Sequence, residues 1–181
     1  MLLYPLQFLQ DVDMTRLSDS FSERLQMNAR ILIVDDHEIV RMGIRSHLLK
    51  SRSDWDVCGE AADGEQAIDL TRTLKPNLII LDITMPRLSG LEATSRMRAL
   101  GINTPVLIFT THDFPTLGTD VREAGAQGYV LKSKAVRDLV RAIDVILDGG
   151  TFFGGPQKAE ANRNDKPNPG AVFFQDFAFA L

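Results

Sequence analysis

Short apolar segments alternate along the middle of the chain with longer segments whose apolar residues recur at helical spacing. A short apolar run is typical of a buried strand, whereas recurrence near a period of 3.6 is typical of an amphipathic helix. The strand-like runs lie at residues 31–34, 57–60, 78–81, 106–109 and 128–131. The first and third of them are almost wholly apolar, as expected for central strands covered on both faces.

The segments between these runs carry apolar stripes, and we expect each stripe to face the sheet. In chain order the stripes contain Ile39, Met42 or Gly43, Ser46 and Leu49; Ala67, Leu70 and Leu74; Leu91, Ser95 and Met97 or Arg98; and Val136, Leu139, Val140, Ile143 and Ile146. Strands that alternate with helices in this way predict βαβ units. The fold class is therefore α/β, with a doubly wound five-stranded parallel sheet and five helices.

Turn residues and composition divide the chain into three parts. We predict one compact domain at 29–150, because two consecutive glycines end the last helical segment. Residues 1–28 form an extension that we expect to be partly helical or disordered, and Met27 offers an alternative natural start. Residues 151–181 are predicted to be a linker and a tail rich in phenylalanine.

The overall charge and the cysteine count narrow the class of protein. The formal net charge of -4 and the pI of about 5.4 argue against a non-specific nucleic-acid binder, since such proteins carry a basic surface. The single cysteine, Cys58, cannot form an internal disulfide, so we expect a cytoplasmic protein. No run of about 18 apolar residues is present, and we expect no membrane span.

Polar residues follow the predicted strands at the edge where parallel α/β sheets bind ligands, outside the carboxyl ends of the strands. The residues at these ends are Asp35, Asp36, Asp82, Thr110 and Lys132. Three carboxylates so close together repel one another and raise each other's pKa unless a cation neutralises them. A hard divalent ion with oxygen ligands, Mg²⁺ above all, meets this need and leaves room for a phosphoryl oxygen.

The remaining groups fit the same chemistry. Lys132 supplies a positive charge and Thr110 a hydroxyl donor, while Asp82 is able to attack phosphorus and form an acyl phosphate. Taken alone, each of these residues also allows a purely structural interpretation. Asp36 and Thr110 fit helix N-caps, Asp82 fits a turn, and Lys132 fits a solvated surface. Because all of them fall at strand ends on one edge, we favour a phosphoryl-accepting site.

Four segments together resemble the response-regulator receiver family of the NarL/FixJ type. They read ILIVDDHE at 31–38, LDITMPRLSG at 81–90, VLIFTTHD at 106–113 and GAQGYVLKS at 125–133. The resemblance covers about residues 30–150 and implies a flavodoxin- or CheY-like sheet with strand order 2-1-3-4-5. It also implies a two-component signalling switch that is not an enzyme, usually one that regulates transcription.

The resemblance implies a role for each residue of the charged group. Asp82 matches the phosphoacceptor and one Mg²⁺ ligand. Asp36 matches a direct Mg²⁺ ligand, Asp35 an acid that holds the ion largely through water, and Thr84 a backbone carbonyl ligand. Lys132 matches the salt-bridging partner of the phosphoryl group.

Further residues match the parts of the family that respond to phosphorylation. Thr110 matches a hydroxyl that moves to meet the phosphoryl group, and Tyr129 an aromatic switch that then turns inward. The face built from the fourth helix, fifth strand and fifth helix would change as a result. Thr84 and His112 occupy the positions two residues after Asp82 and Thr110, which in the family tune the lifetime of the acyl phosphate.

Regulators of the NarL/FixJ type usually continue into a helix-turn-helix domain, but only about 30 residues follow Gly150. We therefore expect no DNA binding by this chain alone, and either a stand-alone receiver or a truncated regulator. The implied partners are a sensor histidine kinase or phosphotransfer protein, and a homodimer also fits the family.

Two alternatives stay open. One is a phosphatase of the haloacid-dehalogenase type, although Thr84 stands where that family has a second aspartate. The other is a receiver-like interaction module that does not depend on phosphorylation.

Overall fold

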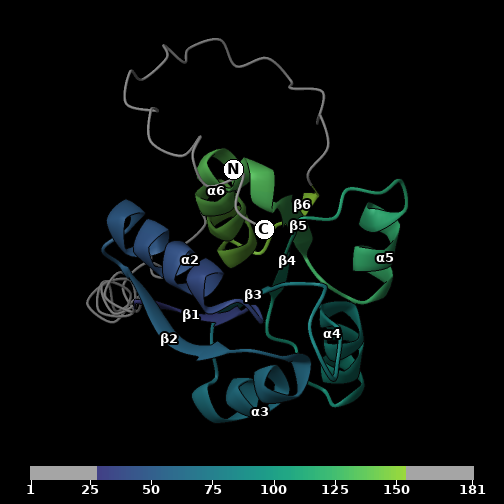
Figure 1. Cartoon of the computed structure of the whole chain (residues 1–181). Coiled ribbons are helices and arrows are strands. Elements are labelled where there is room, and N and C mark those ends of the chain that lie inside the picture. Colours follow the sequence, from purple (N-terminus) through teal and green to yellow (C-terminus); the bar gives the residue numbers. More distant parts are fainter. Residues whose placement is uncertain (1–27, 154–181) are drawn as a thin grey trace, which may run out of the picture.

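The predicted apolar runs form strands that pair in parallel in one sheet, with the order β2-β1-β3-β4-β5-β6 (Figure 1). The computed structural model describes residues 28–153. The strands are β1 (Ala29–Val34), β2 (Trp55–Ala61), β3 (Leu78–Leu81), β4 (Val106–Thr110), β5 (Gly128–Leu131) and β6 (Phe152–Phe153). The predicted fold class and the order of the five main strands are confirmed.

Helices cover both faces of this sheet. They are α2 (Glu38–Ser51), α3 (Gly64–Leu74), α4 (Gly90–Ala99), α5 (Leu117–Glu123) and α6 (Ala135–Leu147), with a short 3-10 turn η2 (Lys132–Lys134) before the last. Figure 1 shows α2 and α6 together on one face and α3, α4 and α5 on the other. No helix among the residues from 28 to 153 is long and apolar enough to cross a membrane.

The strands bury alternate residues in two apolar cores, because successive side chains of a strand point to opposite faces. Ile31 and Ile33 pack with α2 and α6, whereas Leu32 and Val34 pack with α3, α4 and α5. All four side chains are at most 1% exposed. The central strands therefore hold their carboxyl ends rigidly, and those ends carry the polar residues.

Helix α2 is rotated relative to the sequence-based expectation. The predicted stripe is wrong, because Ile39, Met42 and Leu49 are 60%, 55% and 50% exposed. The helix instead buries Ile44 and Leu48. The spacing of four between these residues is as good a helical pattern as the predicted one, so periodicity could not choose between the two faces.

The clearest predicted stripe, on α6, largely faces the sheet as expected. Leu139, Ile143 and Ile146 are buried, and only Val136, at the start of the helix, lies half exposed. This stripe was reliable because the opposite face of α6 is charged and offers no competing apolar row.

The sheet also contains β6, which no sequence pattern predicted. Gly128 pairs with Phe152 and Tyr129 with Phe153, in parallel with β5. The strand lies just past residue 150, in the segment predicted to be a linker. Two residues are too few for a recognisable alternation, so only tertiary pairing identifies it. The predictions for residues 1–27 and for the tail after residue 153 lie outside the described residues.

Candidate functional site

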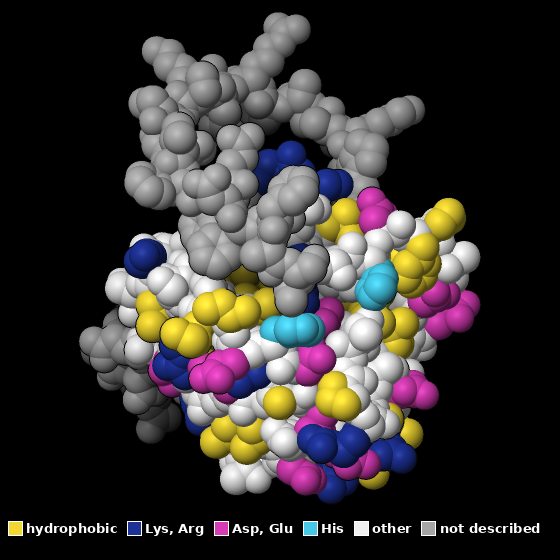
Figure 2. Space-filling model, in the orientation of Figure 1, with side chains coloured by type: hydrophobic (Ala, Val, Ile, Leu, Met, Phe, Trp, Pro, Cys, Tyr) yellow, Lys and Arg dark blue, Asp and Glu magenta, His cyan; other side chains and the backbone are white. Residues whose placement is uncertain are grey.

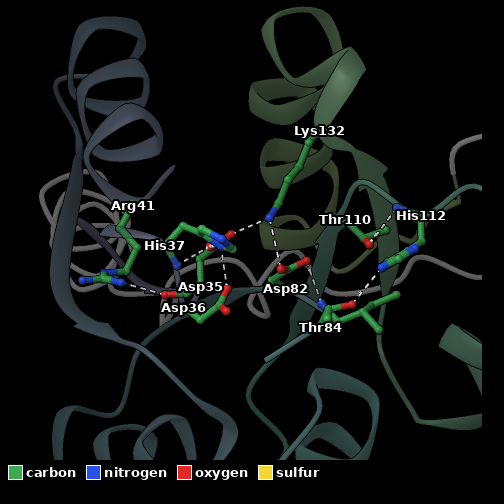
Figure 3. A network of polar contacts seen from close by, with 10 residues as sticks. Asp35, Asp36, His37, Arg41, Asp82, Thr84, Thr110, His112 and Lys132 are labelled. Carbon is green, nitrogen blue, oxygen red and sulfur yellow. Dashed lines mark hydrogen bonds and ion pairs between the residues drawn. The ribbon is translucent and has the colours of Figure 1, made fainter. Parts of the chain in front are cut away.

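The carboxyl ends of β1, β3 and β5 bring an ammonium group between two buried carboxylates (Figure 3). Lys132 Nζ lies 2.6 Å from Asp35 Oδ2 and 3.1 Å from Asp82 Oδ2. Asp35 is 0% exposed and Asp82 5% exposed. The structure thus joins three residues that are 47 and 50 positions apart in the chain, as the strand-end pattern predicted.

The electrostatics of Asp82 reflect its burial. Burial raises the pKa of the Asp82 carboxyl above its ordinary value of 3.8, and the negative charge of Asp35 raises the pKa further. Lys132 acts in the opposite direction and lowers the pKa, as does the backbone N–H of Ile83, which donates to Asp82 Oδ1 at 2.9 Å. The carboxylate therefore lies where added positive charge would stabilise its ionised form.

Asp36 and His37 lie beside this pair, on the solvent side. His37 Nδ1 is 2.7 Å from Asp36 Oδ1 and 3.5 Å from Asp35 Oδ1. One ligand atom from each of the three residues lies within 4.8 Å of the others, a grouping compatible with a bound cation. The carboxylate oxygens here and on Asp82 suit a hard divalent ion such as Mg²⁺. Sequence reasoning missed His37, although it directly follows the two aspartates.

The purely structural interpretations of Asp36 and Thr110 as helix caps, and of Lys132 as a solvated side chain, are wrong. The N-cap of α2 is His37, and its side chain makes no capping hydrogen bond. Asp35 Oδ1 accepts a hydrogen bond from the backbone N–H of His37 at 2.9 Å, so Asp35 shapes the turn that leads into the helix. Thr110 lies seven residues before α5 begins at Leu117, and Lys132 is largely buried against the acids rather than solvated.

Thr110 is 0% exposed at the end of β4. Its hydroxyl accepts a hydrogen bond from the backbone N–H of His112 at 3.1 Å. The His112 ring reaches back across the site, and its Nε2 lies 2.8 Å from the hydroxyl of Thr84 (Figure 3). A polar contact therefore links the loop after β3 to the loop after β4. The sequence singled out all three residues but did not predict this link.

Arg41 on α2 holds the backbone that carries the acidic residues at the end of β1. It was not singled out from the sequence. Its Nη1 donates to the backbone carbonyl of Asp35 at 2.8 Å, and its Nε donates to Glu60 Oε2 at 3.1 Å. Arg45 donates to the other carboxylate oxygen of Glu60 at 2.8 Å. These contacts tie the end of β1 to α2 and β2. Arg41 follows Asp35 by six residues, a separation that matches no helical period, so the sequence offered no diagnostic signal for this contact.

Tyr129 lies outside the acidic cluster, on the half-buried outer part of β5. Its ring packs edge-to-face on Phe153 of β6, with centroids 6.3 Å apart and planes at 70°. The guanidinium of Arg122 lies 3.5 Å above the Phe153 ring. Burial, with a smaller contribution from the negative charge of Asp113, raises the pKa of the Tyr129 phenol. The structure thus connects Tyr129 to β6 through its pairing and ring contact with Phe153.

Comparison with known proteins identifies the family. The sequence pattern of the response regulator receiver domain matches residues 31–144. This chain belongs to that family. A transcriptional regulatory protein, DegU of Brevibacillus brevis, is 33% identical over 124 residues, which is 68% of this chain and 52% of DegU. The nitrate/nitrite response regulator NarL of Escherichia coli is 36% identical over 118 residues, 65% of this chain and 54% of NarL. The chain thus spans about half the length of these relatives.

Solved structures agree in fold. A two-component response regulator of the LuxR family from Aurantimonas sp. superposes with a TM-score of 0.65 at 42% identity, covering 69% of this chain and 89% of that one. The isolated receiver domain of RcsB from Salmonella enterica, solved with the phosphomimetic BeF₃⁻, gives a TM-score of 0.64 at 27% identity. It covers 70% of this chain and 93% of that one. The chain is therefore a receiver domain of the response-regulator type, similar to NarL and LuxR regulators.

Proposed function

We propose that this receiver accepts a phosphoryl group on Asp82 from a phosphorylated histidine of a sensor kinase or phosphotransfer protein. The observation that carries the proposal is the contact of Lys132 Nζ with both Asp82 and the buried Asp35. This acid is buried, which disfavours its charged form, and a fixed positive charge lies within contact distance of it. That arrangement is suited to bind a tetrahedral anion on the carboxylate.

In the proposed reaction a carboxylate oxygen of Asp82 attacks phosphorus while the bond from phosphorus to the histidine nitrogen breaks. An acyl phosphate forms and the electron pair returns to the imidazole. Asp35, Asp36, Asp82 and the backbone carbonyl of Thr84 would hold Mg²⁺, which neutralises the charge of the phosphoryl oxygens. Lys132 would exchange its contact with Asp82 for one with a phosphoryl oxygen.

The response to phosphorylation would start at Thr110. Its hydroxyl would leave the N–H of His112 and move to a phosphoryl oxygen, and Tyr129 would follow into the space released. Because Tyr129 packs on Phe153, the change would reach β6 and the face formed by α5, β5 and α6. The proposed role is a switch rather than an enzyme with turnover. Residue 84 is a threonine (Thr84), whereas a phosphatase of the haloacid-dehalogenase type would need an acidic side chain at this position.

The surface next to the acids supports docking of a protein donor. Ile39 and Met42 on α2 are exposed within six residues of Asp36. Figure 2 shows hydrophobic side chains beside a histidine on this face. We propose that the phosphodonor packs here and presents its histidine to Asp82. Homodimer formation and the absence of DNA binding by this chain remain predictions.

The acceptor assignment is tested by incubating the chain with Mg²⁺ and acetyl phosphate and measuring its intact mass. We expect one phosphoryl group on the wild type and on Asp69→Ala, an exposed carboxylate control on α3, and none on Asp82→Ala. A wild type that gains no mass and shows no spectral response to BeF₃⁻ would support the phosphorylation-independent module instead. Mass gain that persists on Asp82→Ala would move the acceptor to another residue.

The docking surface is tested separately with Met42→Lys. We expect slower phosphoryl transfer from a phosphorylated histidine protein but an unchanged rate with acetyl phosphate, because a small donor needs no docking surface. Leu100→Lys changes a comparably exposed residue on α4's carboxyl-terminal side and serves as the control. Equal rates for Met42→Lys and wild type with the protein donor would contradict the assignment of this surface.

A further inference from the structure

The loop between β3 and α4 (residues 82–89) starts at Asp82 and contains an unusual turn. The backbone N–H of Leu88 donates to the carbonyl of Pro86 at 2.8 Å, which closes a three-residue γ-turn centred on Arg87. Arg87 has a φ of +66°, in the left-handed region that favours glycine. A γ-turn with positive φ is the rare and strained form, and strained residues near functional sites often have a role in positioning.

The side chain of Arg87 explains why an arginine stands in this turn. Its Nη2 forms an ion pair and hydrogen bond with Asp63 Oδ2. Asp63 is 0% exposed, and its other oxygen, Oδ1, accepts from the N–H groups of Glu65 and Gln66 at 2.9 Å each, capping α3. A single buried carboxylate therefore fixes both the start of α3 and the centre of the turn.

The same loop is packed closely at two glycines. A Cβ added to Gly64, the first residue of α3, would lie 2.6 Å from the carbonyl oxygen of Leu88. A Cβ added to Gly90 would overlap the carbonyl of Asp82, and the N–H of Gly90 donates to the carbonyl of Ile83 at 2.9 Å. Displacement of the loop at Arg87 would therefore be passed to the backbone directly after Asp82.

We propose that Arg87 and Asp63 form a positioning pair that holds this loop in the conformation needed to bind Mg²⁺ through the backbone carbonyl of Thr84. The inference rests on the proposed function, since it assigns the pair a task at the phosphoryl-accepting site. Among the described residues, the ion pair of Arg87 is with Asp63, and no hydrogen bond or ion pair joins it to Asp82, Asp35 or Asp36. It acts through the backbone, from the side of the loop that faces α3.

The test compares Mg²⁺ binding by calorimetry with the Mg²⁺ dependence of phosphorylation by acetyl phosphate. Asp63→Asn removes the charge of the pair but keeps the α3 cap, because asparagine caps about as well as aspartate. We expect Asp63→Asn and Arg87→Ala each to weaken Mg²⁺ binding by about tenfold, the lower end for residues that orient metal ligands. The phosphorylation rate at saturating Mg²⁺ should change little. The double variant should lose no more than either single one, because the two residues act as a unit.

Arg87→Gly separates the ion pair from the turn. Glycine adopts positive φ without strain, so this variant keeps the turn and loses the pair. We expect its Mg²⁺ affinity to be as weak as that of Arg87→Ala, even where its unfolding free energy equals that of the wild type. Arg72→Ala, an exposed arginine on α3, should bind Mg²⁺ like the wild type.

The outcomes distinguish this inference from the proposed function. A wild type that binds no Mg²⁺ overturns both. Wild-type affinity in Arg87→Gly, or equal affinities in Asp63→Asn, Arg87→Ala and the wild type, overturns the positioning pair alone. Additive losses in the double variant would likewise show that the two residues do not act together.

Discussion

At the carboxyl ends of β1, β3 and β5 the charged groups are held by direct polar contacts, whereas at the outer edge of the sheet, on β5 and β6, the aromatic residues are held mainly by packing. Asp35 is bound by Lys132 and the N–H of His37, and its backbone by Arg41. Tyr129, by contrast, packs edge-to-face on Phe153 at the edge of the sheet. A charge-stabilised centre has to be rigid before the reaction, while a responding element has to have more than one packing arrangement.

The largest effect is expected at the ammonium that the two acids share. Lys132→Ala leaves Asp35 and Asp82 buried without their cation, and breaking such a pair should lower the unfolding free energy by about 3 kcal/mol. Mg²⁺ should restore part of the loss. Urea denaturation with and without Mg²⁺ measures both effects, and Lys134→Ala, an exposed neighbour, is the control. A loss below that of the control would mean that the charged side is not held as described.

A smaller loss is expected on the packed side. Phe153→Ala removes the ring that covers Tyr129 and should lower the unfolding free energy by about 1.5 kcal/mol. It should also lower the pKa of the Tyr129 phenol, because burial is the main cause of its raised value. Ultraviolet titration follows this group alone in a Tyr4→Phe background, since the chain has two tyrosines.

Phe152→Ala is the matched control for that prediction, because Phe152 packs against the other core and below Arg141. It should lower stability without moving the pKa of Tyr129. An equal pKa change in both variants would show that β6 as a whole, rather than the contact with Phe153, sets the environment of the tyrosine.

A pH dependence of stability should follow from Asp82. Because the pKa of its carboxyl is raised in the folded state, its stabilising contribution is complete below the ordinary value of 3.8 and is lost as pH rises through the folded value. Asp82→Asn has no such charge, so its advantage in unfolding free energy over the wild type should grow as pH rises in that window. Denaturation at several pH values measures it. An advantage that shrinks with pH would mean that Lys132 outweighs burial.

The smallest effect on stability is expected where the two sides meet. His112→Ala removes an exposed hydrogen bond to Thr84 and should change the unfolding free energy by less than about 0.5 kcal/mol. The acyl phosphate should nevertheless hydrolyse faster, because water gains access to Asp82. Loss of the phosphoryl group over time, followed by intact mass, measures this rate. Thr84→Val should act similarly, and an unchanged lifetime in both variants would exclude a role for the contact.

Much of this protein was determined by its sequence alone. Apolar runs such as residues 31–34 and 78–81, short and alternating with helical segments, predict buried strands, and parallel strands place the residues after them on one edge. The convergence of Asp35, Asp82 and Lys132 followed from that topology without coordinates. Where one helix face is clearly apolar, as on α6, the buried side also followed.

Only the tertiary structure decided between patterns of equal quality and revealed contacts without a local signal. Helix α2 carries two apolar rows, and the fit of Ile44 and Leu48 to the sheet selects one of them. The pairing of β6 with β5 joins residues 24 positions apart, and no periodic pattern in the sequence predicts it. The ion pair of Arg87 with Asp63 likewise depends on two loops meeting in space. Local propensity is a property of neighbouring residues, whereas these contacts depend on chain segments that meet only after folding.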